Sequence, residues 1–135
     1  MTLEQRILIV EHDETTVDTY AQILRLEGYR VLMALSGEAG LHEAASGRPD
    51  AIIVDFHMPD IDGLEFVRRL RRQADNRQTP VALVTGDYFL NDTIRGEFEE
   101  LSARVRFKPL WLEDLASLIR GLLQSTEPPS DPIDA

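Results

Sequence analysis

The sequence predicts an α/β fold, a doubly wound five-stranded parallel sheet flanked by five helices. Five short apolar runs alternate with five segments whose apolar residues recur at helical spacing. Most of these runs contain no polar residue, as expected for strands that are buried on both faces of a parallel sheet. Alternating strands and helices imply right-handed crossovers, so successive strands run in the same direction.

The five predicted strands are short, and the third is the most regular. Residues 51–54 form an unbroken apolar run, Ala-Ile-Ile-Val, before the chain turns polar at Asp55. The other runs also end at polar residues, which indicates where each strand gives way to a loop. The predicted strands are, in chain order, residues 7–10, 31–35, 51–54, 80–84 and 105–107.

Each predicted helix combines helical apolar spacing with a start or stop signal. The first begins at a capping box of Thr15 and Asp18 and ends before Gly28. Ser36 caps the second helix and Asn91 caps the fourth. The predicted helices cover residues 15–27, 36–45, 64–74, 91–102 and 112–123.

The composition limits the classes of partner and binding site that the protein can have. The chain has 135 residues, which suits one domain, and its net charge of −10 excludes nucleic acid as a direct partner. It has no apolar run long enough to cross a bilayer, and without cysteine it has no disulfides or thiolate metal sites. We therefore expect a soluble, cytoplasmic protein that does not bind a membrane.

Two segments stand apart from this pattern. The domain is expected to cover residues 1–123, and residues 124–135 are too poor in apolar residues to fold, so we predict a disordered tail or linker. The third helix carries a basic cluster that we expect to face water, with a docking surface as the second interpretation. The cluster consists of Arg68, Arg69, Arg71 and Arg72.

Asp55 is the leading candidate for a functional residue. It ends the third strand and precedes a loop that contains Pro59, Asp60, Asp62 and Gly63. Open α/β sheets place their ligands at the carboxyl ends of their strands. Several other polar residues follow predicted strands, so a parallel sheet would gather them at the same edge. These residues are Glu11, His12, Asp13, Thr85 and Lys108.

Together these residues resemble the pattern of a response-regulator receiver domain, the phosphoacceptor half of a two-component signalling pair. The similarity covers residues 5 to 123 and implies a flavodoxin-like fold. Four motifs in this order carry it. They are Ile7 to Asp13, Asp55 with Met58-Pro59 and Asp62-Gly63, Thr85-Gly86, and Lys108-Pro109.

The resemblance implies that Asp55 accepts a phosphoryl group from a histidine kinase or phosphotransfer protein. Lys108 would supply a positive charge, Thr85 a hydrogen bond to the phosphoryl group, and His57 a backbone carbonyl to a divalent metal. Magnesium is the expected cofactor. Any catalysis would be limited to metal-assisted self-phosphorylation and dephosphorylation. The candidate metal ligands are Glu11, His12, Asp13, Asp55 and His57.

Two residues depart from the family pattern. His12 stands where the family has a carboxylate, and since imidazole is a poor ligand for magnesium, we expect weakened magnesium affinity unless Asp13 turns inward as a substitute. A transition metal bound by His12, Asp13, Asp55 and His57 is an alternative. Val105 stands where the family commonly carries an aromatic residue, so a conformational switch would need a different readout.

Three functional hypotheses follow. The first is a phosphoacceptor module that signals to an output protein of unknown identity. The second is a phosphorylation-independent pseudo-receiver that acts as a protein-interaction module, for which His12 and Val105 argue. The third, a stand-alone hydrolase, is the weakest because the sequence offers no second nucleophile or paired acid and base. Labelling by a small phosphodonor separates the first two.

Overall fold

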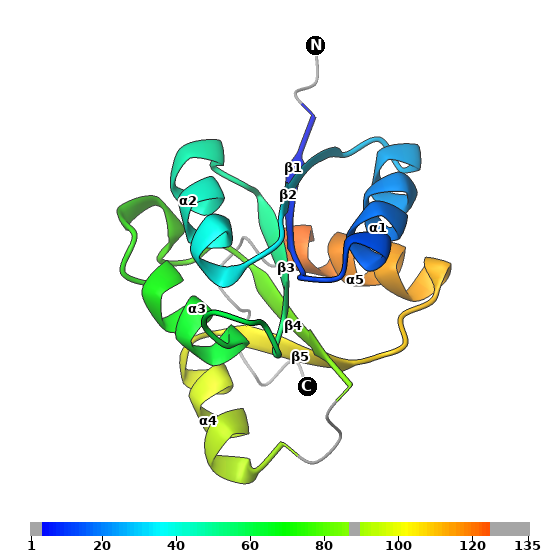
Figure 1. Cartoon of the computed structure of the whole chain (residues 1–135). Coiled ribbons are helices and arrows are strands. Elements are labelled where there is room, and N and C mark those ends of the chain that lie inside the picture. The colour runs from blue at the N-terminus through cyan, green and yellow to red at the C-terminus, as the bar shows by residue number, and fades with distance from the viewer. Residues whose placement is uncertain (1–3, 87–89, 125–135) are drawn as a thin grey trace.

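One parallel sheet lies between two layers of helices in the computed structural model, which describes residues 4–86 and 90–124 (Figure 1). The strand order is β2-β1-β3-β4-β5, and every neighbouring pair is parallel. This arrangement confirms the predicted fold class. The elements are β1 (Arg6–Val10), α1 (Glu14–Leu26), β2 (Arg30–Ala34), α2 (Gly37–Gly47), β3 (Ala51–Asp55), α3 (Gly63–Leu70), the 3-10 turn η1 (Ala74–Asn76), β4 (Val81–Thr85), α4 (Asp92–Glu100), β5 (Ala103–Phe107) and α5 (Leu112–Gln124).

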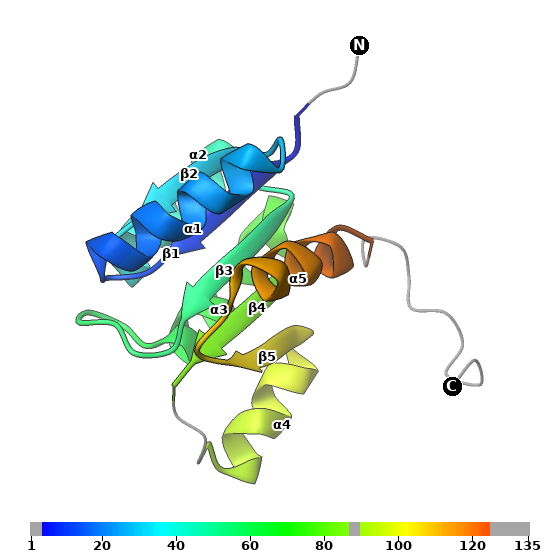
Figure 2. The ribbon, with the colours of Figure 1, turned by 90° about the vertical axis from the view of Figure 1, so that its right-hand side faces the viewer.

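The two layers follow from the alternation of side chains along the central strands. Helices α1 and α5 cover one face of the sheet, and α2, α3 and α4 cover the other (Figures 1 and 2). In β3, Ile53 packs with the α1 and α5 side, whereas Ile52 and Val54 pack with the α2 to α4 side, around Phe66. Strands β3 and β4 are buried at all five positions, so they must occupy the middle of the sheet.

The start of α1 differs from the prediction. Its N-cap is Asp13, whose carboxylate accepts hydrogen bonds from the backbone and the hydroxyl of Thr16, so the predicted capping box at Thr15 and Asp18 is wrong. Asp13 starts the helix two residues before Thr15, and its carboxylate accepts a hydrogen bond from a backbone N–H of the first turn that has no partner within the helix. The acidic side chain of Glu14 then also lies in the first turn, where the helix dipole favours it. The predicted caps Ser36 and Asn91 are confirmed.

Helix α3 ends at Leu70 rather than at residue 74. The next residue, Arg71, does not face water as predicted. Its guanidinium donates to the carbonyl oxygens of Leu101 (2.8 Å), Thr79 (2.7 Å) and Asn76 (3.0 Å). These carbonyls belong to two loops, so Arg71 ties both loops to the end of α3.

Two other arginines of the predicted basic cluster belong to a chain of alternating charges across α2, α3 and α4. Arg69 pairs with Glu38 and Glu65, and Arg68 pairs with Glu65 and Glu97. We call these five residues the α3 charge chain. Since each of these arginines has acidic partners, the predicted solvated face is in fact an ion-paired one, and Arg72 is the one exposed member of the basic cluster.

The predicted tail falls mostly outside the described residues. Gln124 is the last residue of α5, and residues 125–135 are not among those that the structure describes. Within the described ranges, none of the helices has the length and apolarity needed to cross a membrane.

Candidate functional site

Asp55 is the last residue of β3, at the carboxyl edge of the sheet, and only 5% of its surface is exposed. The loop that follows turns back closely over the strand, with the Gly63 amide donating to the carbonyl of Phe56 (2.8 Å). A Cβ atom at Gly63 would lie 2.4 Å from Leu83 Cδ1 and 2.9 Å from the Asp55 carbonyl oxygen. Glycine is therefore required for the loop to cover the end of β3 so closely.

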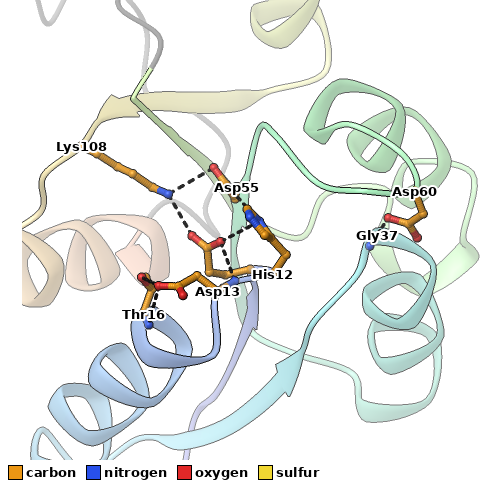
Figure 3. Close-up of polar contacts among 8 residues, drawn as sticks. His12, Asp13, Thr16, Gly37, Asp55, Asp60 and Lys108 are labelled. Atoms are coloured by element: carbon orange, nitrogen blue, oxygen red, sulfur yellow. Dashed lines mark hydrogen bonds and ion pairs between the residues drawn. The ribbon is translucent and has the colours of Figure 1, made fainter.

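Glu11 and Lys108 bring a second carboxylate and a cation to Asp55. Glu11 directly follows β1 and is 3% exposed, and Lys108 directly follows β5. The Lys108 ammonium lies 2.9 Å from Glu11 Oε1 and 3.4 Å from Asp55 Oδ1 (Figure 3). Its backbone N–H donates to the Thr85 carbonyl (2.8 Å), which fixes the start of the side chain at this edge.

His12 bridges the same two carboxylates through their other oxygens. Its Nδ1 atom lies 3.2 Å from Glu11 Oε2 and 3.5 Å from Asp55 Oδ2 (Figure 3). The imidazole side chain is half exposed, so it closes the group toward solvent. We call Glu11, His12, Asp55 and Lys108 the carboxyl-edge cluster.

The electrostatics of this cluster disfavour a second buried negative charge. Burial, and then the nearby charge of Glu11, raise the pKa of Asp55, and Lys108 offsets part of this effect. Burial works against the ammonium form of Lys108, but its hydrogen bond to Glu11 and the charge of Asp55 outweigh burial and raise its pKa. Lys108 is thus the cation in this cluster that favours the ionised form of Asp55.

The other predicted site residues, Thr85, His57 and Asp13, are not members of the carboxyl-edge cluster. Thr85 ends β4 and is fully buried, and its neighbour in β5 is Phe107. His57 is exposed, and its ring meets the Phe56 ring edge-on at 4.8 Å between centroids. Asp13 does not turn inward, because its carboxylate caps α1.

Asp60 was not predicted as a positioning residue. Its carboxylate accepts hydrogen bonds from the backbone N–H groups of Gly37 (3.0 Å) and Glu38 (2.8 Å), at the start of α2 (Figure 3). Burial opposes the ionised form, but these backbone hydrogen bonds prevail and lower the pKa of Asp60. The contact anchors the loop after Asp55 to α2. Its partners lie more than twenty residues earlier in the chain, so no local pattern could have indicated it.

A divalent cation would find three donors in this cluster. Glu11, His12 and Asp55 each offer one ligand atom, and these atoms lie within 4.8 Å of one another. The two carboxylate oxygens suit magnesium, which prefers hard oxygen ligands. The imidazole nitrogen does not, so the donor set fits a divalent ion but only partly fits magnesium.

Comparisons with known proteins agree with this geometry. Residues 7–120 match the response regulator receiver domain family. The response regulator MprA of Mycobacterium avium is 34% identical over 126 residues, which cover 93% of this chain and 54% of MprA. The chain therefore spans about half the length of the curated relatives it matches.

Solved structures give the same result. Chemotaxis protein CheY4 of Vibrio cholerae superposes with a TM-score of 0.82 at 27% identity, covering 90% of this chain and all of CheY4. The receiver domain of a histidine kinase from Syntrophus aciditrophicus gives a TM-score of 0.79 at 30% identity, covering 94% of this chain and 96% of that domain. The chain belongs to the receiver-domain family of response regulators, the phosphoacceptor domains of two-component signalling.

Proposed function

We propose that Asp55 is the residue that receives the phosphoryl group, from a histidine kinase or a phosphotransfer protein. The observation that carries the proposal is the position of Asp55, a buried carboxylate at the carboxyl edge, held between the Lys108 ammonium and the His12 imidazole. Glu11 is equally buried, but its Oε1 is committed to Lys108 at 2.9 Å and its Oε2 lies 3.2 Å from both the Asp13 N–H and His12 Nδ1.

The transfer exchanges one bond to phosphorus for another. An oxygen of the Asp55 carboxylate attacks the phosphorus of a phosphohistidine, and a P–O bond forms as the P–N bond breaks. The electron pair of the P–N bond stays on the donor imidazole, which then takes up a proton. The product is an acyl phosphate on Asp55.

The residues around Asp55 have distinct roles in this step. Lys108 favours the ionised form of Asp55 and would neutralise charge on the incoming phosphoryl oxygens. Thr85 offers a hydroxyl to a phosphoryl oxygen from the adjacent strand end. A divalent cation held by Glu11 and Asp55, with the His57 carbonyl, would supply further charge neutralisation when bound. Magnesium is the ion that the family suggests, with its affinity weakened by His12.

The proposed donor also suggests where the module works. A histidine kinase or phosphotransfer protein would deliver the phosphoryl group in the cytoplasm, and the modified domain would then act on an output protein or an attached output domain. Asp60 would keep the loop after Asp55 in place by holding the start of α2.

Mass spectrometry after incubation with acetyl phosphate and magnesium tests the proposal. We expect one acyl phosphate, on Asp55, and none in Asp55→Asn. Asp62→Asn is the matched control, since this exposed carboxylate caps α3 away from the cluster, and it should still label. Labelling of Asp13, Asp60 or Asp62 instead would contradict the proposal. A protein that is labelled by no phosphodonor with any divalent ion would favour the pseudo-receiver.

A further inference from the structure

The carboxyl-edge cluster places a nitrogen donor at the point where its two carboxylates meet. His12 Nδ1 lies 3.2 Å from Glu11 Oε2 and 3.5 Å from Asp55 Oδ2, while Lys108 contacts the opposite oxygen of each carboxylate. The oxygens nearest to His12 are therefore not the ones that pair with the lysine. The His12 ring lies against the two carboxylates (Figure 3), and it is the half-exposed member of the three.

The distances from the His12 nitrogen to the two carboxylate oxygens match those between ligands of one small cation. Two donors bound to the same ion at about 2.0 to 2.2 Å lie roughly 3.0 to 3.5 Å apart for bond angles between octahedral and tetrahedral. Both distances from the His12 nitrogen fall in this range. All three donor atoms lie within 4.8 Å of one another, so one ion could contact them after small adjustments of the Glu11 and Asp55 side chains, which extend from the ends of β1 and β3.

The chemistry of the donors sets which ion they prefer. One imidazole nitrogen with two carboxylate oxygens is a ligand set typical of first-row transition ions, whereas magnesium dehydrates reluctantly and prefers oxygen. Charge acts in the same direction. With Lys108 inside the cluster, the two carboxylates leave one net negative charge, so attraction to a hard cation is weak. A transition ion compensates through its bond to nitrogen, and magnesium cannot.

We propose that His12 makes this site selective for a divalent transition ion, of the manganese to zinc series, over magnesium. His12 is then the specificity-determining ligand, and Glu11 and Asp55 are the shared ones. The inference rests on the proposed function for the role of the ion, which would accompany phosphorylation of Asp55. It also explains why a histidine can stand at this position in a chain whose Asp55, Thr85 and Lys108 follow the family pattern.

Binding measurements on the intact chain test the inference without measuring activity. We would titrate the protein with magnesium and with cobalt at about pH 8, where an ordinary imidazole is neutral, using calorimetry and the visible absorption of cobalt. We expect cobalt to bind the natural protein about tenfold or more tightly than magnesium. His12→Asp should tighten magnesium binding and lower the ratio of cobalt to magnesium affinity by about tenfold or more.

Two further variants identify the nitrogen ligand. His42→Gln is the matched control, because His42 is an exposed histidine on α2, and it should leave both affinities unchanged. A hyperfine-shifted imidazole signal in the NMR spectrum of the cobalt form should disappear in His12→Asp and persist in His42→Gln. If the signal instead disappears in His57→Ala and persists in His12→Asp, the assignment of the ligand is overturned.

The failure of this inference can be distinguished from the failure of the proposed function. If Asp55 labels with acetyl phosphate but His12→Asp leaves the affinity ratio unchanged, the selectivity inference is wrong and the proposed function stands. In that case the imidazole is a hydrogen-bonding substitute for an ion. If cobalt binds through His12 but Asp55 accepts no phosphoryl group with cobalt, manganese or magnesium, the proposed function is wrong and the selectivity stands.

Discussion

The chain contains two groups of charged side chains that use similar residues in opposite ways. The α3 charge chain alternates acid and base on a partly exposed surface, with every arginine between two glutamates. The carboxyl-edge cluster instead buries two carboxylates next to each other and closes them with one lysine and one imidazole.

The pKa values of the acidic groups are shifted in opposite directions in the two groups of charges. In the α3 charge chain, the hydrogen bond from Arg69 helps to lower the pKa of Glu65, and hydrogen bonds to glutamates raise the pKa values of Arg68 and Arg69. All three groups are therefore more stable in their charged forms. In the carboxyl-edge cluster, burial and Glu11 raise the pKa of Asp55, so folding disfavours its charged form relative to the same side chain in water.

This contrast separates a charge arrangement that supports the fold from one that is poised for a reaction. Exposed alternating charges add little to stability, because solvent and salt screen them. Burying two like charges side by side costs free energy, and such arrangements occur mostly at functional sites, where the charged groups bind a cation or take part in a reaction. Substitutions in the two groups should therefore differ in both the size and the sign of their effects.

Lys108→Met should have the largest effect, because it leaves Glu11 and Asp55 buried without their cation. We expect a loss of about 2 to 3 kcal/mol in the free energy of unfolding at neutral pH, below the roughly 3 to 5 kcal/mol of a fully buried pair because Lys108 is partly exposed. Urea denaturation measures it. The loss should shrink as the pH falls, because protonation of one carboxylate removes the unpaired charge. A loss that is equal at neutral and acidic pH would indicate that Lys108 acts through packing alone.

Arg71→Met should have the next largest effect, although Arg71 belongs to neither group. Its guanidinium donates to four carbonyl oxygens of two loops, and burial lowers its pKa. We expect a loss of about 2 kcal/mol in the free energy of unfolding, from carbonyls left without a donor. Arg72→Met is the matched control on the next, exposed residue, and it should change stability by less than about 0.5 kcal/mol. Equal effects would contradict a structural role for Arg71.

These two arginines also show what the sequence could predict and what it could not. The apolar runs predicted the parallel sheet, and the polar residue after each run predicted the shared edge, since parallel strands bring their ends together. Glu11, Asp55 and Lys108 were therefore predictable neighbours. Arg71 follows Val67 by four residues and Leu64 by seven, so it falls on the apolar side of the predicted helix and Arg72 does not, but the carbonyl partners of Arg71 lie in distant loops that no local pattern could locate.

Contacts between residues far apart in the sequence could not be predicted for the same reason. Asp60 binds amides more than twenty residues away, and that pairing depends on how α2 packs beside the loop. Asp13 presents a different difficulty, because it competes with Thr15 as a cap within three residues, and both satisfy the local pattern. The bridging position of His12 was not predictable either, because it depends on a contact with Asp55, more than forty residues later in the chain.

Asp55→Asn should have a smaller effect of the opposite sign. It removes the less stable of the two buried charges and leaves Glu11 paired with Lys108, so we expect a gain of about 1 kcal/mol in the free energy of unfolding at neutral pH. Because folding raises the pKa of Asp55, the natural protein loses stability as the pH rises from the unfolded pKa through the folded one. The gain should therefore be present at neutral pH and decrease toward about pH 4, near the unfolded value. Urea denaturation of both proteins at the two pH values measures this, and a destabilised Asp55→Asn at neutral pH would show that the Lys108 pair outweighs burial.

Arg69→Met, in the α3 charge chain, should have the smallest effect. The side chain is partly exposed and pairs with Glu38 and Glu65 at 2.8 Å each, in positions where water and salt compete with both contacts. We expect a shift of the urea midpoint close to the error of the measurement in dilute buffer, and no shift at about 1 M salt, where the screening length falls to about 3 Å. Lys108→Met, measured in parallel, should keep most of its effect at high salt, because buried charges are screened much less. If salt instead abolished the effect of Lys108→Met and left that of Arg69→Met unchanged, the two groups of charges would have the reverse of the roles argued above.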